Sequence, residues 1–179
     1  MNPDIELSPI VQEVIDSLPL LDSDKATLSD YGFLGWIAPH LYFGEFEKDE
    51  VFPVLKNWSW KADWNVDPKL DISEFDTWLV FGSGPDNEPI IIKPYSSTIW
   101  ILSNSLELEV MNSNMKNLIE TSSAFADMIS DAIKLDSNSS AKRIPVKLVD
   151  NFIAKFNRIE GASVPTSIWL TWANERTYS

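Results

Sequence analysis

The chain contains one histidine, and this limits the catalytic chemistry that its sequence can support. His40 lies between Pro39 and Leu41, and no Gly-x-Ser-x-Gly nucleophile motif occurs. A Ser-His-Asp triad would have to use this imidazole as the base that takes the serine proton. The sequence has no cysteine, which excludes thiolate nucleophiles, disulfides and cysteine-ligated zinc within these 179 residues. We therefore expect His40 to be a packing or surface residue, and we expect no catalytic residues.

A glycine-rich segment, Gly82-Ser83-Gly84, has the composition of a phosphate-binding loop but not its context. Such loops work because backbone N–H groups and a helix N-terminus face the phosphate. Here Pro85 removes one donor, no Lys-Ser or Lys-Thr pair follows, and the next apolar run is typical of a strand. The segment is better interpreted as a hairpin turn.

Carboxylates are abundant enough to suggest metal binding. Asp63, Asp67 and Asp71 recur at every fourth position, which would align them on a helix. Pro68 interrupts that helix, and the ligand and glycine spacing of an EF-hand is absent. We expect no metal and no cofactor. A carboxylate-based enzyme, including a glycosidase with paired carboxylates, remains an alternative.

The charge balance favours a basic partner. The chain has 14 Lys and Arg residues against 27 Asp and Glu residues, a net charge of −13. Such a surface repels nucleic acid and anionic membranes, and it raises the rate of encounter with a basic protein. The alternative is that the charge serves solubility alone.

One segment combines acidic and aromatic residues and is the predicted partner-binding site. Tryptophan is enriched at the centres of interfaces, and acidic residues suit a rim that meets a basic protein. The predicted site consists of Glu45, Glu47, Asp49, Glu50, Trp58 and Trp60. Trp58 and Trp60 are spaced for one face of a strand. The competing interpretation is that these tryptophans, with Trp64, form a core wall beneath a loop.

Hydrophobic periodicity predicts a strand meander followed by helices. Apolar or alternating runs predict strands at 78–81, 90–93, 98–102 and 106–110, and the two glutamates of the last strand should face solvent. Helices are predicted at 113–135, with Ser113 as N-cap, and at 146–159. The inward residues of these helices are Met115, Leu118, Ile119, Phe125, Ile129, Ala132 and Ile133, then Val146, Val149, Phe152, Ile153 and Phe156.

The remaining elements complete one α+β domain over 1–179, a mostly antiparallel meander flanked by helices. Ser8 and Pro9 are expected to start a helix that ends before Pro19. A weaker helix is expected over 23–31, a strand over 41–46, and a last helix after Pro165. No signal peptide and no run of about 18 apolar residues is evident. We therefore expect a cytoplasmic protein.

Four segments resemble the SUKH superfamily. Residues 78–92 resemble its central hairpin, in which a turn rich in Gly, Asp and Asn joins two apolar strands, and 99–102 look like its next strand. Residues 111–115, which open the long helix, are similar to its Val-Asn-Ser-Ser motif. Residues 158–162 with Trp169 are similar to the closing Ile-Asp-x-Ala…Trp segment of one subgroup. The Pro-Asp helix and Asn-Gly pair usual in the family are not evident in the first forty residues.

The resemblance implies a function that the residues alone do not give. Bacterial SUKH proteins are mostly immunity proteins that bind and neutralise a cognate toxin domain, often a nuclease or deaminase, and eukaryotic relatives include scaffold-like regulators. The family has no shared catalytic motif, so the resemblance assigns no catalytic residue. An acidic inhibitor would suit a basic nuclease by acting as a decoy for phosphates. The alternatives are a scaffold module without a toxin partner and a carboxylate-based enzyme.

Overall fold

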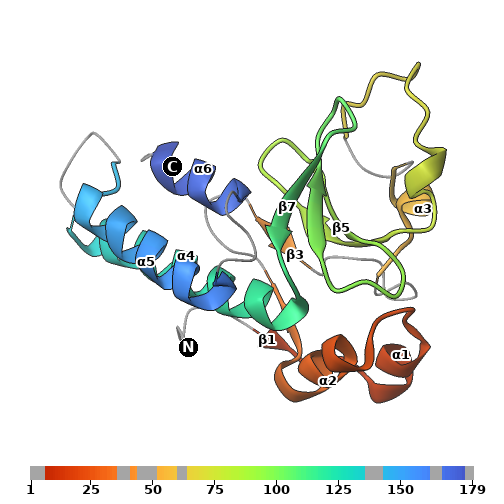
Figure 1. The fold of residues 1–179 in the computed structure, drawn as a ribbon, viewed down its shortest axis with the longest axis horizontal. Coiled ribbons are helices and arrows are strands. Elements are labelled where there is room, and N and C mark those ends of the chain that lie inside the picture. The colour runs from red at the N-terminus through yellow and green to blue at the C-terminus, as the bar shows by residue number, and fades with distance from the viewer. Residues whose placement is uncertain are drawn as a thin grey trace.

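The computed structural model describes residues 7–35, 41–43, 52–59, 64–135, 143–161 and 167–175. Its elements form an α+β arrangement in which a five-stranded antiparallel sheet lies beside a group of helices (Figure 1). In chain order they are β1 (Leu7–Ser8), α1 (Gln12–Ser17), α2 (Asp22–Tyr31), β2 (Phe33–Leu34), β3 (Tyr42–Phe43), α3 (Leu55–Ser59), the 3-10 helix η1 (Ser73–Phe75), β4 (Leu79–Ser83), β5 (Pro89–Ile92), β6 (Ile99–Leu102), β7 (Leu108–Asn112), α4 (Met115–Leu135), α5 (Val146–Glu160) and α6 (Ile168–Glu175).

The large sheet is a meander with the order β3-β4-β5-β6-β7, and every neighbouring pair is antiparallel. The predicted α+β class and antiparallel meander are therefore confirmed. Strands β4, β5 and β6 coincide with the expected runs because short apolar, β-branched segments bounded by turn residues have few other ways to bury their side chains.

The last strand begins later than predicted. Glu107 and Glu109 are exposed as expected, but Leu106 adopts a φ of 64° in a turn, and Leu108 is 37% exposed. The cause is local, because the backbone N–H of Ser103 donates to the carbonyl of Glu107 at 3.0 Å and the Ser103 hydroxyl accepts from the N–H of Glu107. These bonds close a turn over residues that alternation alone assigns to the strand.

The predicted hairpin turn is confirmed from Gly84 to Glu88, whereas Gly82 and Ser83 belong to the end of β4. The N–H of Gly84 donates to the carbonyl of Glu88 at 2.8 Å, and Asn87 takes a φ of 60°. Gly82 lies at a bulge between β4 and β5 and opposite Phe43 of β3. A Cβ at Gly82 would overlap the carbonyl oxygen of Tyr42, so this position requires glycine.

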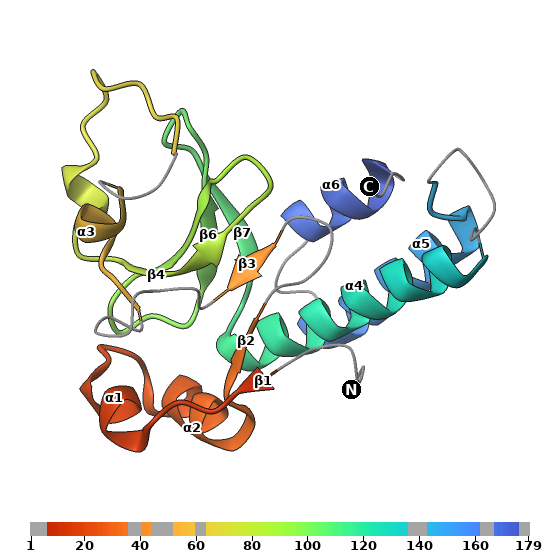
Figure 2. The same cartoon turned by 180° about the vertical axis from the view of Figure 1, so that it is seen from behind.

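Both faces of the sheet are covered, but by different kinds of structure (Figures 1 and 2). On one face, Phe81, Ile92 and Ile101 join a core shared with α1, α2, α4, α5 and α6. On the opposite face, a second cluster is covered by α3, η1 and the chain around them; it contains Leu55, Trp64, Phe75, Trp78, Val80, Ile91 and Leu102. The alternation of β-strand side chains directs neighbouring residues to these two clusters.

The long helices α4 and α5 pack side by side, and the Phe125 and Phe152 rings meet edge to face at 5.4 Å. Most of the predicted inward residues are buried, but Ile133 is 48% exposed and Val146 is 50% exposed. The predicted burial of these two residues is wrong. Ile133 lies in the last turn of α4, and Val146 is the first residue of α5. Ile153 is only partly buried.

The N-terminal prediction is also wrong in its boundary. Ser8 does not cap a helix; it lies in β1 and pairs with Phe33, and α1 begins at Gln12. Gly32, with a φ of 73°, allows this pairing, because a Cβ there would lie 2.5 Å from the carbonyl oxygen of Ser8. Helix α2 occupies the segment where a weaker helix is expected. No helix in the described ranges is long and apolar enough to cross a membrane.

Candidate functional site

Most of the predicted partner-binding site lies outside the described residues. Glu45, Glu47, Asp49, Glu50 and Trp60 fall within 44–51 and 60–63. His40 lies outside the described residues as well. The predicted site therefore stays a prediction, and only Trp58 can be placed.

Trp58 lies in α3, so the predicted strand at this position is wrong. It is partly buried and packs against the second cluster, with its ring 6.1 Å from the ring of Trp64. Trp64 itself is 7% exposed, and its indole Nε1 has no hydrogen-bond partner. The start of α3 is held against the sheet, because the N–H of Leu55 donates to the carbonyl of Trp78 at 2.8 Å and both side chains belong to the second cluster. This packing supports the core-wall interpretation for Trp64 and leaves part of Trp58 accessible.

The segment that leads into α4 meets the end of α5 and the start of α6 in the interior, in what we call the buried junction: Asn112, Ser113, Asn117, Thr121, Glu160 and Trp169. At its centre is Asn112, the last residue of β7, which is fully buried. Its side-chain Nδ2 donates to Glu160 Oε1 at 2.6 Å and to Thr121 Oγ1 at 3.1 Å. Its Oδ1 accepts from the indole Nε1 of Trp169 at 2.8 Å. One amide therefore links β7, α4, α5 and α6.

Glu160 supplies the acidic group of this junction and is 4% exposed. Besides Asn112, its carboxylate accepts from the backbone N–H of Ser113 at 3.2 Å and from Asn117 Nδ2 at 3.3 Å. In the described part of the chain, no lysine, arginine or histidine pairs with it. Hydrogen bonds from Asn112, Ser113 and Asn117 take the place of a cation, because a buried carboxylate needs donors for its oxygens.

A second buried carboxylate approaches the same helix end. Asp24 of α2 is 1% exposed; its Oδ1 accepts from the N–H of Met115 at 3.0 Å, and its Oδ2 accepts from the Ser97 hydroxyl at 3.1 Å. Burial raises the pKa of Asp24, and the hydrogen bond from Met115 acts in the opposite direction. The predicted N-cap is corrected from Ser113 to Asn114, whose Oδ1 accepts from the N–H of Asn117 at 2.9 Å.

These carboxylates are placed to hold elements together. Each one already accepts hydrogen bonds from backbone and side-chain donors, and neither adjoins a cysteine or a described histidine. Glu160 lies in the sequence pattern at 158–162, but the sequence did not indicate which residues would donate hydrogen bonds to it. Asp24 gave no signal, because it lies in a polar helix where acidic residues are ordinarily solvated.

Metal-ligating geometry is not found in the ranges that the structure describes, where no group of three or more His, Asp or Glu side chains could hold an ion. Asp67 and Asp71 each accept a hydrogen bond from the N–H two residues ahead, at 2.9 Å from Lys69 and 3.0 Å from Ser73. The bond from Ser73 lowers the pKa of Asp71. Asp63, the third member of the predicted series, lies outside the described residues.

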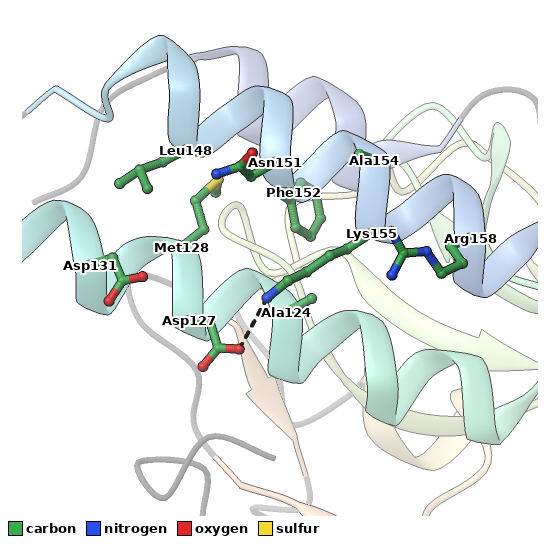
Figure 3. A pocket seen from close by; sticks show the side chains of 10 residues that line it. All are labelled: Ala124, Asp127, Met128, Asp131, Leu148, Asn151, Phe152, Ala154, Lys155 and Arg158. Carbon is green, nitrogen blue, oxygen red and sulfur yellow. Dashed lines mark ion pairs between the residues drawn. The ribbon is translucent and has the colours of Figure 1, made fainter.

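A groove of about 290 Å³ runs between α4 and α5 (Figure 3). Its floor contains Met128 and Phe152, both buried, and its walls are charged. Lys155 Nζ lies 3.5 Å from Asp127 Oδ2 across the groove, and Asp131 pairs with Lys134 at 3.4 Å. The charges on this surface therefore largely neutralise one another, as expected between two amphipathic helices.

A second groove, of about 480 Å³, lies between β7 and α6 and differs in charge. Its lining carries Glu109 and Glu175 and no basic residue; the other lining residues are Ser167, Leu170, Thr171 and Asn174. Neither glutamate forms an ion pair with a described residue. Uncompensated negative charge beside a strand is suited to a cationic group.

Comparisons with known proteins add no relative: no protein-family model, no curated protein and no solved structure matches this chain.

Proposed function

We propose that this chain is an immunity protein that binds and neutralises a cognate toxin domain of the nuclease or deaminase type in the cytoplasm. The proposal rests on the resemblance of four segments to SUKH domains. It describes a function of binding, with no cofactor and no catalytic step.

The observation that supports it best is the buried junction. Residues of the Asn-Ser motif at 112–113 and of the closing motif at 158–169 are 47 or more positions apart in sequence, yet they share the hydrogen bonds of Glu160. The two segments therefore belong to one buried polar site of this fold. Buried polar groups of this kind are retained because losing one partner leaves the other unsatisfied, at a cost of roughly 1–3 kcal/mol.

The charge of the chain gives a second line of support. Nuclease domains are basic where they contact nucleic acid, and a protein of net charge −13 is attracted to that surface at long range. Such attraction acts mainly on the rate of association, which matters for an inhibitor that must reach the toxin before its substrate does.

The proposal can be tested by co-expressing the chain in bacteria with the C-terminal domain of a toxin encoded beside its gene. We expect growth to be rescued and the two proteins to co-purify in a fixed ratio. Rescue should disappear when the immunity gene carries an early stop codon, which serves as the control.

Failure of both rescue and co-purification would reject the immunity function. Stable association with a complex of the host cell, without rescue from any toxin, would instead favour a scaffold or regulatory module.

A further inference from the structure

Among the residues that the structure describes, strand β7 has an open edge. It is the outermost strand of the sheet beyond β6. The N–H of Ser103 donates to the carbonyl of Glu107, so the pair Ser103–Glu107 is hydrogen-bonded. Because pairs alternate along an antiparallel ladder, Ile101–Glu109 is bonded too, and the N–H groups of Leu108 and Val110 point away from β6. No described residue donates to or accepts from this outward edge of Leu108.

The open edge lies beside the acidic groove. Glu109 lies in β7 and also lines the groove, where it faces residues of α6 that include Glu175. The Ser167 hydroxyl donates to the carbonyl of Met111 at 2.9 Å, which fixes the start of α6 next to the end of β7. The groove and the open edge are therefore parts of one surface. Neither feature was predicted from the sequence.

The charge of this surface selects its occupant. Glu107 and Glu109 are exposed and have no cationic partner among the described residues. A second copy of this chain at the edge would place like charges opposite one another, which is unfavourable. A basic strand would instead place lysine or arginine side chains opposite Glu109 and toward the groove.

We infer that β7 is a docking edge that accepts an extended, basic segment of a partner protein as an additional strand, with its cationic side chains directed to Glu109 and Glu175. Main-chain hydrogen bonds to Leu108 and Val110 supply affinity, and the acidic groove supplies selectivity for positive charge. This inference deepens the proposed function and rests on it for the identity of the partner, the toxin domain.

The first test removes the outward donor while leaving the sheet intact. Leu108→Pro deletes an N–H that makes no bond to β6, and proline is tolerated on edge strands in this orientation. Leu108→Ala, which keeps the N–H, is the matched control. We expect Leu108→Pro to weaken toxin binding at least about tenfold and Leu108→Ala to change it little. Circular dichroism and the melting temperature must show that both variants are folded.

The second test addresses charge. Glu109→Gln combined with Glu175→Gln should weaken binding and reduce its dependence on salt, because two uncompensated charges of the groove are removed. Glu13→Gln combined with Glu74→Gln removes the same charge from exposed positions elsewhere and should leave binding near the wild-type value.

A third measurement does not depend on the toxin. A short peptide of alternating lysine and valine should protect the amides of Leu108 and Val110 from hydrogen exchange, and the same peptide with N-methylated alternate residues should not.

Toxin rescue that survives Leu108→Pro with full affinity overturns the docking edge while leaving the immunity function intact. Absence of any toxin partner, together with peptide protection at β7, rejects the immunity function and keeps the edge. Lack of protection at β7 by both the peptide and a bound toxin overturns the inference.

Discussion

The two faces of the sheet are stabilised in different ways. On the helix face, elements from both ends of the chain are joined by the buried junction around Asn112 and by Asp24. The side chains of Asn112, Glu160 and Asp24 all form hydrogen bonds there. On the opposite face, the cover is a mostly irregular segment that packs aromatic rings such as Trp64 and Trp78 on the strands, and one buried indole N–H has no partner. The helix face therefore adds a network of directed hydrogen bonds to its apolar core, although the buried Ser122 hydroxyl of α4 has no partner, whereas the tryptophan face depends on apolar area.

This difference bears on how residue types indicate function. Tryptophans beside acidic residues suggested an interface through Trp58 and Trp60, but Trp58 packs partly against the second cluster and its neighbour Trp64 is a core residue. Conversely, Asp24 and Glu160 belong to the residue types least often buried, and the structure buries both. Composition alone therefore does not separate an interface from a core.

The largest expected effect is loss of apolar packing on the helix face. Phe125 is 4% exposed and contacts the rings of Phe152 and Trp169, so Phe125→Ala should lower the free energy of unfolding by about 3–5 kcal/mol. Ile133→Ala on the same helix should cost less than about 1 kcal/mol, because half of that side chain is exposed. Urea denaturation of both variants measures the difference. If both variants lose the same free energy of unfolding, α4 does not bury the face that carries Phe125.

The buried junction should be nearly as sensitive. Glu160→Ala removes the acceptor of Asn112 Nδ2 and of the Ser113 N–H, so we expect a loss of about 3 kcal/mol. Glu120→Ala, an exposed glutamate of α4, is the control and should change stability by less than about 0.5 kcal/mol. If thermal unfolding of the Glu160 variant matches that of wild type, directed hydrogen bonds do not specify this face.

A matched pair of half-buried tryptophans compares the two faces directly. Trp58 packs on the tryptophan face and Trp172 on the helix face, and each is partly buried. Each alanine variant should lower stability by about 1–2 kcal/mol, in proportion to the apolar area that is buried. The melting temperature and the rate of dissociation from the proposed toxin partner should be measured on the same samples. Faster dissociation of the Trp58 variant at an unchanged melting temperature would restore the interface interpretation.

The smallest expected effect concerns pH. Burial raises the pKa of Asp24, so the folded state binds a proton more readily than the unfolded state does. The stability associated with the protonated carboxyl is complete below the unfolded pKa of about 3.9 and is lost as pH rises through the higher folded pKa. Asp24→Asn keeps an oxygen acceptor for Met115 and does not titrate. Its stability relative to wild type should therefore increase with pH across this window, as measured by denaturation at several pH values; a constant difference would contradict the raised pKa.

Local sequence patterns were informative wherever an element's own residues decide its form. The hairpin around Gly84 and the strands of the meander follow from alternation and turn residues. The same reasoning failed at Ser8, because a strand pairing with Phe33 competed with the helix start, and at Leu106, because the hydroxyl of Ser103 closes a turn. In each failure a contact outside the local pattern prevailed.

The sequence by itself determined the α+β class, the antiparallel meander, the two long amphipathic helices and the strong negative charge. Only the tertiary structure decided that Asn112 meets Glu160, that Asp24 binds the N-terminus of α4, and that Glu109 and Glu175 share a groove at an open strand edge. The physical reason is the distance along the sequence between the residues that make contact. Periodicity records how a residue relates to neighbours within its own helix or strand, whereas Asp24 and Met115 are 91 positions apart. Their contact exists because packing the apolar faces of the helices on the sheet brings them together.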